Sequence, residues 1–187
     1  MSSASQAFRD LAASSSDELE GVLRRGQRPS IESLLGFEYR GFNHPRRTAL
    51  LGIRKFIKGF FPSSGEAFGF NARARQNGLE GDWIARPDDA NPRRFAFYAV
   101  APVQPDGRDG AFQNAVLLDY GRGSSRAYDP ARLVRDYLVR VDSDSDDLLL
   151  GKAYMALGSA RIPVGFFLLE RHRPFEVEPA LERRFSG

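Results

Sequence analysis

The sequence contains no cysteine and only two histidines among its 187 residues. Without cysteine the chain cannot form a disulfide, use a thiolate as a nucleophile, or bind zinc or an iron–sulfur cluster through sulfur. Two histidines cannot make a three-histidine metal site, and they leave His44 and His172 as the imidazole bases. These absences exclude most thiol and metal chemistry, and we predict no cofactor from the composition.

Long apolar runs are also missing. The longest are far shorter than the ~20 residues that cross a bilayer. The first eleven residues have neither the basic start nor the apolar stretch of a signal peptide. We therefore expect a cytoplasmic protein without a membrane span. The hydrophobic content of 42% is enough for one sizeable core in a chain of this length.

Charge is nearly balanced, with 27 Lys and Arg against 24 Asp and Glu and a formal net charge of +3. An excess this small does not by itself indicate nucleic-acid binding. The positive charge is unevenly placed, because residues 40–58 hold no acid and six cations: Arg40, Arg46, Arg47, Arg54, Lys55 and Lys58. Phenylalanines interleave with these cations, as on surfaces that stack single-stranded nucleic acid. The same spacing fits strand burial, so we favour a rim that attracts small anions.

The first 30 residues are predicted to be helical. Ser15 and Glu18 have the spacing of a capping box, and Gly26 lies where the helix would end. A second short helix is expected over residues 5–13. We expect residues 1–30 to form a helical segment packed on the main body, and a partner-binding helix is the alternative.

From residue 37 onward the sequence is typical of antiparallel strands. Runs rich in Phe, Tyr, Val, Ile and Leu alternate with Gly, Pro, Asp and Ser clusters. Eight strands are predicted, over residues 37–43, 53–61, 67–77, 93–103, 113–120, 133–141, 148–157 and 162–171. Several of the connections have the composition of short hairpin turns, so successive strands should be neighbours.

Eight meandering strands predict a closed barrel, because closure removes the two open edges that a flat sheet would leave. We therefore expect a mainly β protein: an eight-stranded antiparallel up-and-down barrel over residues 31–175. The helical segment 1–30 would precede it, and a tail with a short C-terminal helix, 176–187, would follow. The connections 44–52, 78–92 and 121–132 would gather at the barrel ends, the first with a short helix near residues 47–51.

Two motifs resemble those of the calycin superfamily, which includes lipocalins, fatty-acid-binding proteins and haem-binding nitrobindins. Phe37-Glu38-Tyr39-Arg40-Gly41 opens the first strand where nitrobindin-like chains have Gly-x-Trp-x-Gly, and Phe166-Phe167-Leu168-Leu169-Glu170-Arg171 is similar to their closing strand. The resemblance implies a ligand-holding barrel. In nitrobindin-like barrels a histidine of the closing region binds haem iron, so the resemblance also implies haem bound through His172 as an alternative. Its flanking arginines instead favour exposure to solvent.

Strand alternation gives the most specific candidate site. Arg135 and Tyr137 share one face of their strand, and Lys152 and Tyr154 share one face of the next. If Val141 lies opposite Leu148, Tyr137 faces Lys152 and Arg135 faces Tyr154. In the lumen these four residues would hold a carboxylate, phosphate or enolate, beside an apolar lining that includes Phe167. Fatty-acid-binding proteins resemble this arrangement in their Arg-x-Tyr pair.

The opposite orientation stays open. In that case the basic and tyrosine side chains face outward, and Leu149, Gly151, Ala153 and Met155 form the interior. Because a buried cation without an anion is costly, the two orientations predict different burial. In a third arrangement Asp119 and Asp136 act as counter-charges in a structural salt network.

These residues favour lipocalin-like binding of an amphipathic or anionic small molecule, lipid-like or an aromatic acid, in the barrel lumen. The first alternative is an isomerase-like or cyclase-like enzyme on the same barrel, with a Tyr or an Asp such as Asp119 as acid or base. The second is an interaction module with a solid barrel. The single tryptophan, Trp83, is expected to close one barrel end, with ligand stacking as the alternative.

Overall fold

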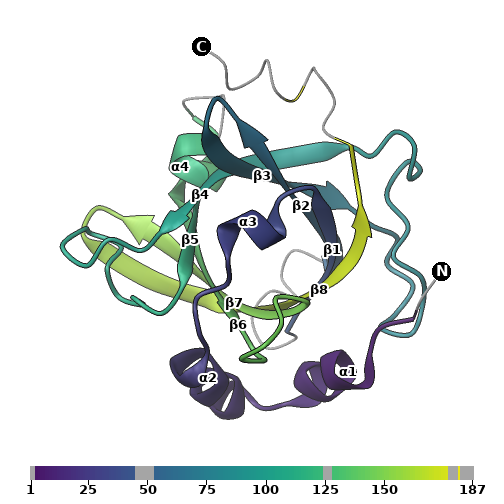
Figure 1. The fold of residues 1–187 in the computed structure, drawn as a ribbon, viewed down its shortest axis with the longest axis horizontal. Coiled ribbons are helices and arrows are strands. Elements are labelled where there is room, and N and C mark those ends of the chain that lie inside the picture. The colour runs from purple at the N-terminus through teal and green to yellow at the C-terminus, as the bar shows by residue number, and fades with distance from the viewer. Residues whose placement is uncertain (1–2, 45–52, 124–127, 177–180, 182–187) are drawn as a thin grey trace.

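The computed structural model describes residues 3–44, 53–123, 128–176 and 181. Eight strands surround a central axis, with two helices outside and a third across one end (Figure 1). The helices and the strands are α1 (Gln6–Ala13), α2 (Ser16–Arg25), α3 (Ile31–Leu34), β1 (Phe37–Asn43), β2 (Lys55–Ser63), β3 (Glu66–Arg73), β4 (Arg94–Pro102), β5 (Val116–Asp119), α4 (Tyr120–Gly123), the 3-10 helix η2 (Pro130–Leu133), β6 (Val134–Arg140), β7 (Leu148–Leu157) and β8 (Ala160–Pro174).

The strands form a closed barrel in which each pairs antiparallel with the next and β8 pairs with β1. The predicted fold class is confirmed. The bounds of β1 and β7 are those expected from the sequence, whereas β5 is shorter and β8 is longer. None of the described helices has the length and the apolar character needed to cross a bilayer.

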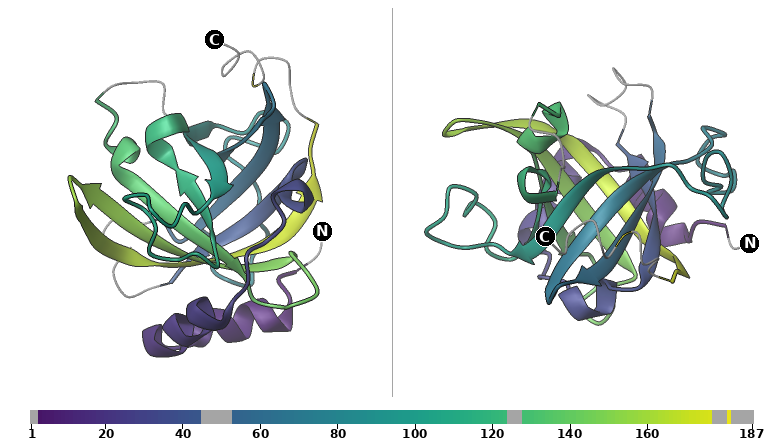
Figure 2. Two further views of the ribbon diagram at one scale, coloured as in Figure 1. Left: turned by 60° about the vertical axis from the view of Figure 1, so that its left-hand side comes forward. Right: turned by 90° about the horizontal axis from the view of Figure 1, so that it is seen from above.

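The N-terminal helices lie on the outside of the barrel, on one side of it (Figures 1 and 2). The predicted capping box at the start of α2 is present: the Ser15 hydroxyl accepts from the Glu18 N–H, and the Glu18 carboxylate accepts from the Ser15 N–H. Gly26 ends the helix as expected. Phe8 of α1 and Leu23 of α2 are fully buried against the outer barrel face.

The barrel wall therefore separates two apolar cores. The outer core joins α1 and α2 to outward-facing residues such as Ile57, Phe70, Val139, Leu150 and Leu168. The inner core fills the lumen with residues such as Tyr39, Phe60, Tyr98, Leu138 and Leu169. Most strands consequently bury both faces, which removes the alternation of apolar and polar residues that would mark the lumen side.

Aromatic rings fill the lumen because glycines leave room for them. Three rings lie over a glycine directly opposite on a neighbouring strand: Phe56 over Gly41, Tyr98 over Gly69 and Phe167 over Gly151. At one end the lumen is closed by α3, whose Leu34 is fully buried in the inner core (Figure 1). The expected helix near residues 47–51 and, apart from Leu181, the expected C-terminal helix lie outside the described residues.

Candidate functional site

The lumen holds a buried polar cluster that consists of Lys58, Asn71, Tyr120 and Asp136. Lys58 Nζ donates to the Tyr120 hydroxyl at 2.5 Å and to Asp136 Oδ2 at 3.1 Å. The Tyr120 hydroxyl donates to the same carboxylate oxygen at 2.9 Å and accepts from Asn71 Nδ2 at 3.2 Å. Each of the four residues is less than one-tenth exposed. We call this group the lumen cluster.

Aromatic rings surround the ammonium of this cluster. Lys58 Nζ lies 4.6 Å from the ring centroid of Tyr98, 5.1 Å from that of Tyr120 and 5.2 Å from that of Phe167. An ammonium has three N–H donors, and Tyr120 and Asp136 take two of them. Among the described residues no acceptor takes the third, which leaves a donor facing an aromatic enclosure.

Burial dominates the electrostatics of the lumen cluster. It lowers the pKa of Lys58, although the neighbouring Asp136 acts in the opposite direction. Burial also raises the pKa of Tyr120 and of Tyr98 well above their usual value, and Asp136 adds to both shifts. Both phenols are therefore neutral hydrogen-bond donors at physiological pH. The Lys58–Asp136 pair is neutral as a whole when both groups are charged.

The barrel end opposite α3 gives solvent a route toward the cluster. Val134 at the start of β6 is half-buried and packs on the inner core, as does Ala153, which lies opposite Asp136 on β7. Met155 lies opposite Val134, shares the face of Ala153 by alternation and is also half-buried. Small and apolar side chains thus lead from the barrel end to the lumen cluster.

The register predicted for the β6–β7 hairpin is confirmed. Tyr137 pairs with Lys152 and Arg135 pairs with Tyr154. The Val141 N–H donates to the Leu148 carbonyl at 3.0 Å. The strand order and turn position that the sequence predicted therefore place these side chains as neighbours on one face.

The prediction that this face lines the lumen is wrong. Tyr137 belongs to the outer core, and the Lys152 ammonium contacts the Glu20 carboxylate of α2 at 2.6 Å. Arg135 contacts Asp109 at 3.3 Å and Asp119 at 3.0 Å. The outer surface offers these cations carboxylates, whereas the lumen needs the small side chain of Gly151 beneath Phe167. Asp119 is a counter-charge, as the third arrangement predicted.

The outward group forms an aromatic and ionic layer under α2 and residues 103–115. Tyr137 lies 5.6 Å from Tyr154 and 4.9 Å from Phe112 between ring centroids. Burial raises the pKa of Tyr137 to about 12. Burial alone would lower the pKa of Lys152, but the hydrogen bond from Lys152 to Glu20 outweighs it and the pKa is raised. These groups hold the helix to the barrel.

Phe167 alone among the five candidate ligand-binding residues lies in the lumen, where the sequence placed it. Its ring fills the space over Gly151 and borders Lys58 Nζ. Lys58, Asn71 and Tyr120 were missed as site residues, and Asp136 was considered only as a counter-charge. The pattern Phe56-x-Lys58-x-Phe60, with a cation between two aromatics on one strand face, is the sequence signal that marks them.

His172 does not fit the haem-ligand role that the calycin resemblance implies. Both ring nitrogens are buried, and among the described residues neither has a hydrogen-bond partner. Burial lowers the pKa of His172 to about 4, and the nearby Arg40 and Arg173 lower it further. With no exposed surface on either nitrogen, the imidazole has no face on which iron could bind. The expectation of a solvent-exposed His172 is also wrong.

Trp83 lies outside the barrel and does not close its end as expected. Its indole N–H donates to the Gly41 carbonyl at 3.0 Å, and its ring meets Phe8 of α1 edge-on at 5.9 Å. Within the described ranges no group of three or more His, Asp or Glu side chains is placed to hold a metal ion.

No protein-family model, curated protein or solved structure matches this chain. The closed eight-stranded antiparallel barrel is compatible with a calycin-like fold. Fold alone does not specify function, so function has to be argued from the lumen cluster itself.

Proposed function

We propose that the barrel binds a lipid-like amphipathic small molecule in its lumen, with a carbonyl oxygen at Lys58. The observation that carries the proposal is the unused N–H of a buried ammonium at the inner end of an apolar passage. A carbonyl oxygen would accept that third N–H. The apolar body would lie along Ala153, Met155 and Val134.

The charge of the cluster selects the polar end of the ligand. Asp136 already neutralises Lys58 at 3.1 Å, so an added anion would meet a carboxylate as well as the ammonium. A neutral carbonyl group avoids that repulsion and still accepts a charge-assisted hydrogen bond. This argument favours ketones, aldehydes and esters over free acids in the lumen.

The energetics of burial point in the same direction. A buried ion pair is often less stable than an apolar pair of the same volume, because both charges lose their hydration. Aromatic and aliphatic residues fill the rest of the lumen, so an apolar replacement at positions 58 and 136 would complete the core. A ligand-binding role accounts for polar groups at those two positions.

Met155 gives a site-specific test, because the chain has two methionines and the other is Met1. We would label the methionine methyl groups with 13C and titrate the full chain with 2-octanone, following the Met155 signal. Saturable shifts are expected. Ala153→Phe should weaken binding at least tenfold by filling the passage, whereas Lys152→Ala, on the opposite face of β7, should stay within twofold of wild type.

Two results would overturn the lumen proposal. One is wild-type affinity in Ala153→Phe, and the other is a tenfold loss in Lys152→Ala, which would return the site to the outer face. If Ala153→Phe fails to fold, Val134→Phe blocks the same passage from β6. Circular dichroism melting curves establish that each variant is folded.

A second candidate function, isomerase-like acid–base chemistry, is favoured by the hydrogen-bond chain Lys58–Tyr120–Asp136. The Tyr120 hydroxyl lies 2.5 Å from an amine and 2.9 Å from a carboxylate, so it could pass a proton between them. In this case the wild-type protein would exchange the α-hydrogens of 2-octanone for deuterium in D2O. Tyr120→Phe would lose that exchange, and a rate equal to the protein-free rate in wild type would reject the candidate.

A further inference from the structure

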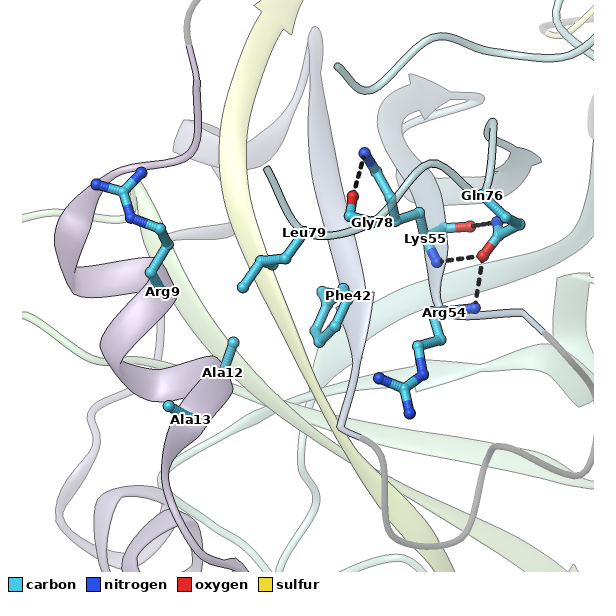
Figure 3. Close-up of a pocket in the computed structure, with 9 residues that line it drawn as sticks. All are labelled: Arg9, Ala12, Ala13, Phe42, Arg54, Lys55, Gln76, Gly78 and Leu79. Atoms are coloured by element: carbon cyan, nitrogen blue, oxygen red, sulfur yellow. Dashed lines mark hydrogen bonds between the residues drawn. The ribbon is translucent and has the colours of Figure 1, made fainter. Parts of the chain in front are cut away.

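A groove of about 400 Å³ runs between α1 and residues 76–79 on the outside of the barrel (Figure 3). Phe42 of β1 and Leu79 lie on one side of it, and Ala12 and Ala13 of α1 lie on the other (Figure 3). The volume is within the range of small-molecule sites. The groove has no lining residue in common with the lumen cluster.

Hydrogen bonds fix the wall of this groove. Gln76 Oε1 accepts from the backbone N–H groups of Arg54 at 2.8 Å and Lys55 at 2.9 Å. Gln76 Nε2 donates back to the Lys55 carbonyl at 2.6 Å. The side chain of Gln76 therefore ties residues 76–79 to the start of β2, and the groove is formed before any ligand arrives.

The same wall contains a buried ammonium whose hydrogen-bond acceptors are all neutral. Lys55 Nζ donates to Asn77 Oδ1 at 2.6 Å and to the carbonyls of Gly78, Gly81 and Asp82 at 3.0, 2.5 and 3.1 Å. Lys55 is fully buried. Burial lowers its pKa to about 8, with Arg40 adding and Asp82 opposing, so the ammonium is mostly charged at pH 7. Its positive charge has no directly bonded carboxylate.

A second positive charge lies at one end of the groove. Arg54 is exposed, its guanidinium lies at that end (Figure 3), and within the described part of the chain it has no ion-pair partner. Arg9, at the other end, points away from Ala12 and Ala13 and donates to Ala4 and Gln6. The groove thus combines an apolar centre with an unpaired cation at one end.

We propose that this groove is a second binding site, for a small amphipathic anion such as a medium-chain or aryl carboxylate. The carboxylate would pair with the Arg54 guanidinium, and the apolar body would contact Phe42, Leu79 and Ala12. An inorganic anion would leave the apolar centre unused, and a neutral lipid would leave Arg54 unused. The sequence expectation of an anion-attracting surface within residues 40–58 is thereby given a location.

Methyl NMR tests the groove with octanoate as the probe. The full chain, labelled with 13C at alanine and leucine methyl groups, would be titrated with octanoate while the Leu79 and Ala12 signals are followed. We expect saturable shifts at both residues. Arg54→Gln should weaken binding at least fivefold. Arg25→Gln makes the same charge change at an exposed arginine at the end of α2 and should stay within twofold of wild type.

Other results would overturn the groove proposal. Equal affinities of Arg54→Gln and wild type would remove the ion pair, and equal effects of Arg54→Gln and Arg25→Gln would show attraction by net charge alone. Binding of sulfate at the affinity of octanoate would indicate a plain anion site. The variant Ala153→Phe separates the two sites: it should abolish the Met155 response to 2-octanone and leave the Leu79 response to octanoate intact.

Discussion

The ring of Phe167 lies over Gly151, its direct partner in the β7–β8 ladder. A Cβ atom at position 151 would overlap three atoms of the ring. The glycine is therefore required by the close approach of the phenyl ring. Glycine otherwise weakens a strand, and an aromatic neighbour across the ladder compensates by covering the bare backbone.

Gly151→Ala should destabilise the protein by about 2 kcal/mol, because adding a methyl group to a filled core forces side chains or backbone to move. Gly21→Ala is the matched control. Gly21 lies in α2, where an added Cβ meets only the flexible end of Arg25, and alanine favours a helix by about 1 kcal/mol over glycine. Urea unfolding should show opposite signs for the two variants, and equal midpoints would contradict the packing argument.

Lys58→Met should cost about 3–5 kcal/mol of unfolding free energy, because it leaves the Asp136 carboxylate buried without its ammonium. The double variant Lys58→Met with Asp136→Leu should recover most of that loss, since neither charge is then buried. A double-mutant cycle in urea measures both effects. If the double variant is as unstable as the sum of the single variants, the two groups do not act as a pair.

His172 should make stability fall in acid. Its pKa is about 4 in the folded chain against an ordinary value of 6.5. Below pH 6.5 the unfolded chain binds the proton more readily, so the free energy of unfolding decreases as the pH falls from 6.5 to 4. The decrease attributable to His172 should be about 2–3 kcal/mol at about 1.4 kcal/mol per unit. His172→Gln should have a flatter profile over that interval, and identical slopes would argue against the buried neutral imidazole.

Trp83 reports on the loop that Lys55 holds. Lys55 Nζ lies 3.7 Å from the indole centroid, and Trp83 is 3% exposed. Lys55→Met removes the ammonium that joins the oxygens of residues 77–82, so the loop should loosen and acrylamide should quench Trp83 at least twofold more strongly. Arg54→Gln, the adjacent exposed cation, should leave quenching unchanged. Unchanged quenching in Lys55→Met would show that the loop is held by other contacts.

The sequence was sufficient for the barrel and for one ladder within it. Turn residues between runs of strand formers predicted eight strands, and the alternation in β6 and β7 predicted that Tyr137 pairs with Lys152. The capping residues Ser15 and Glu18 located the start of α2. These features depend on short-range geometry, which a single chain segment carries by itself.

The orientation of those strands was not accessible from the same pattern. Alternation identifies the buried face when the other face meets water, but α2 and Phe112 cover Tyr137 from outside. The lumen cluster was missed for a related reason. Lys58, Tyr120 and Asp136 are 62 and 16 residues apart along the chain, and only barrel closure brings them together.

The two-sided barrel wall has a consequence for how the chain unfolds. Because Phe8 and Leu23 cover one side of the same sheet whose other side encloses Lys58, loss of the helices would expose an apolar outer surface. Such a surface on a sheet is prone to self-association. A fragment trimmed to the barrel would therefore aggregate before it lost its strands, and the solubility of the protein depends on its first 30 residues.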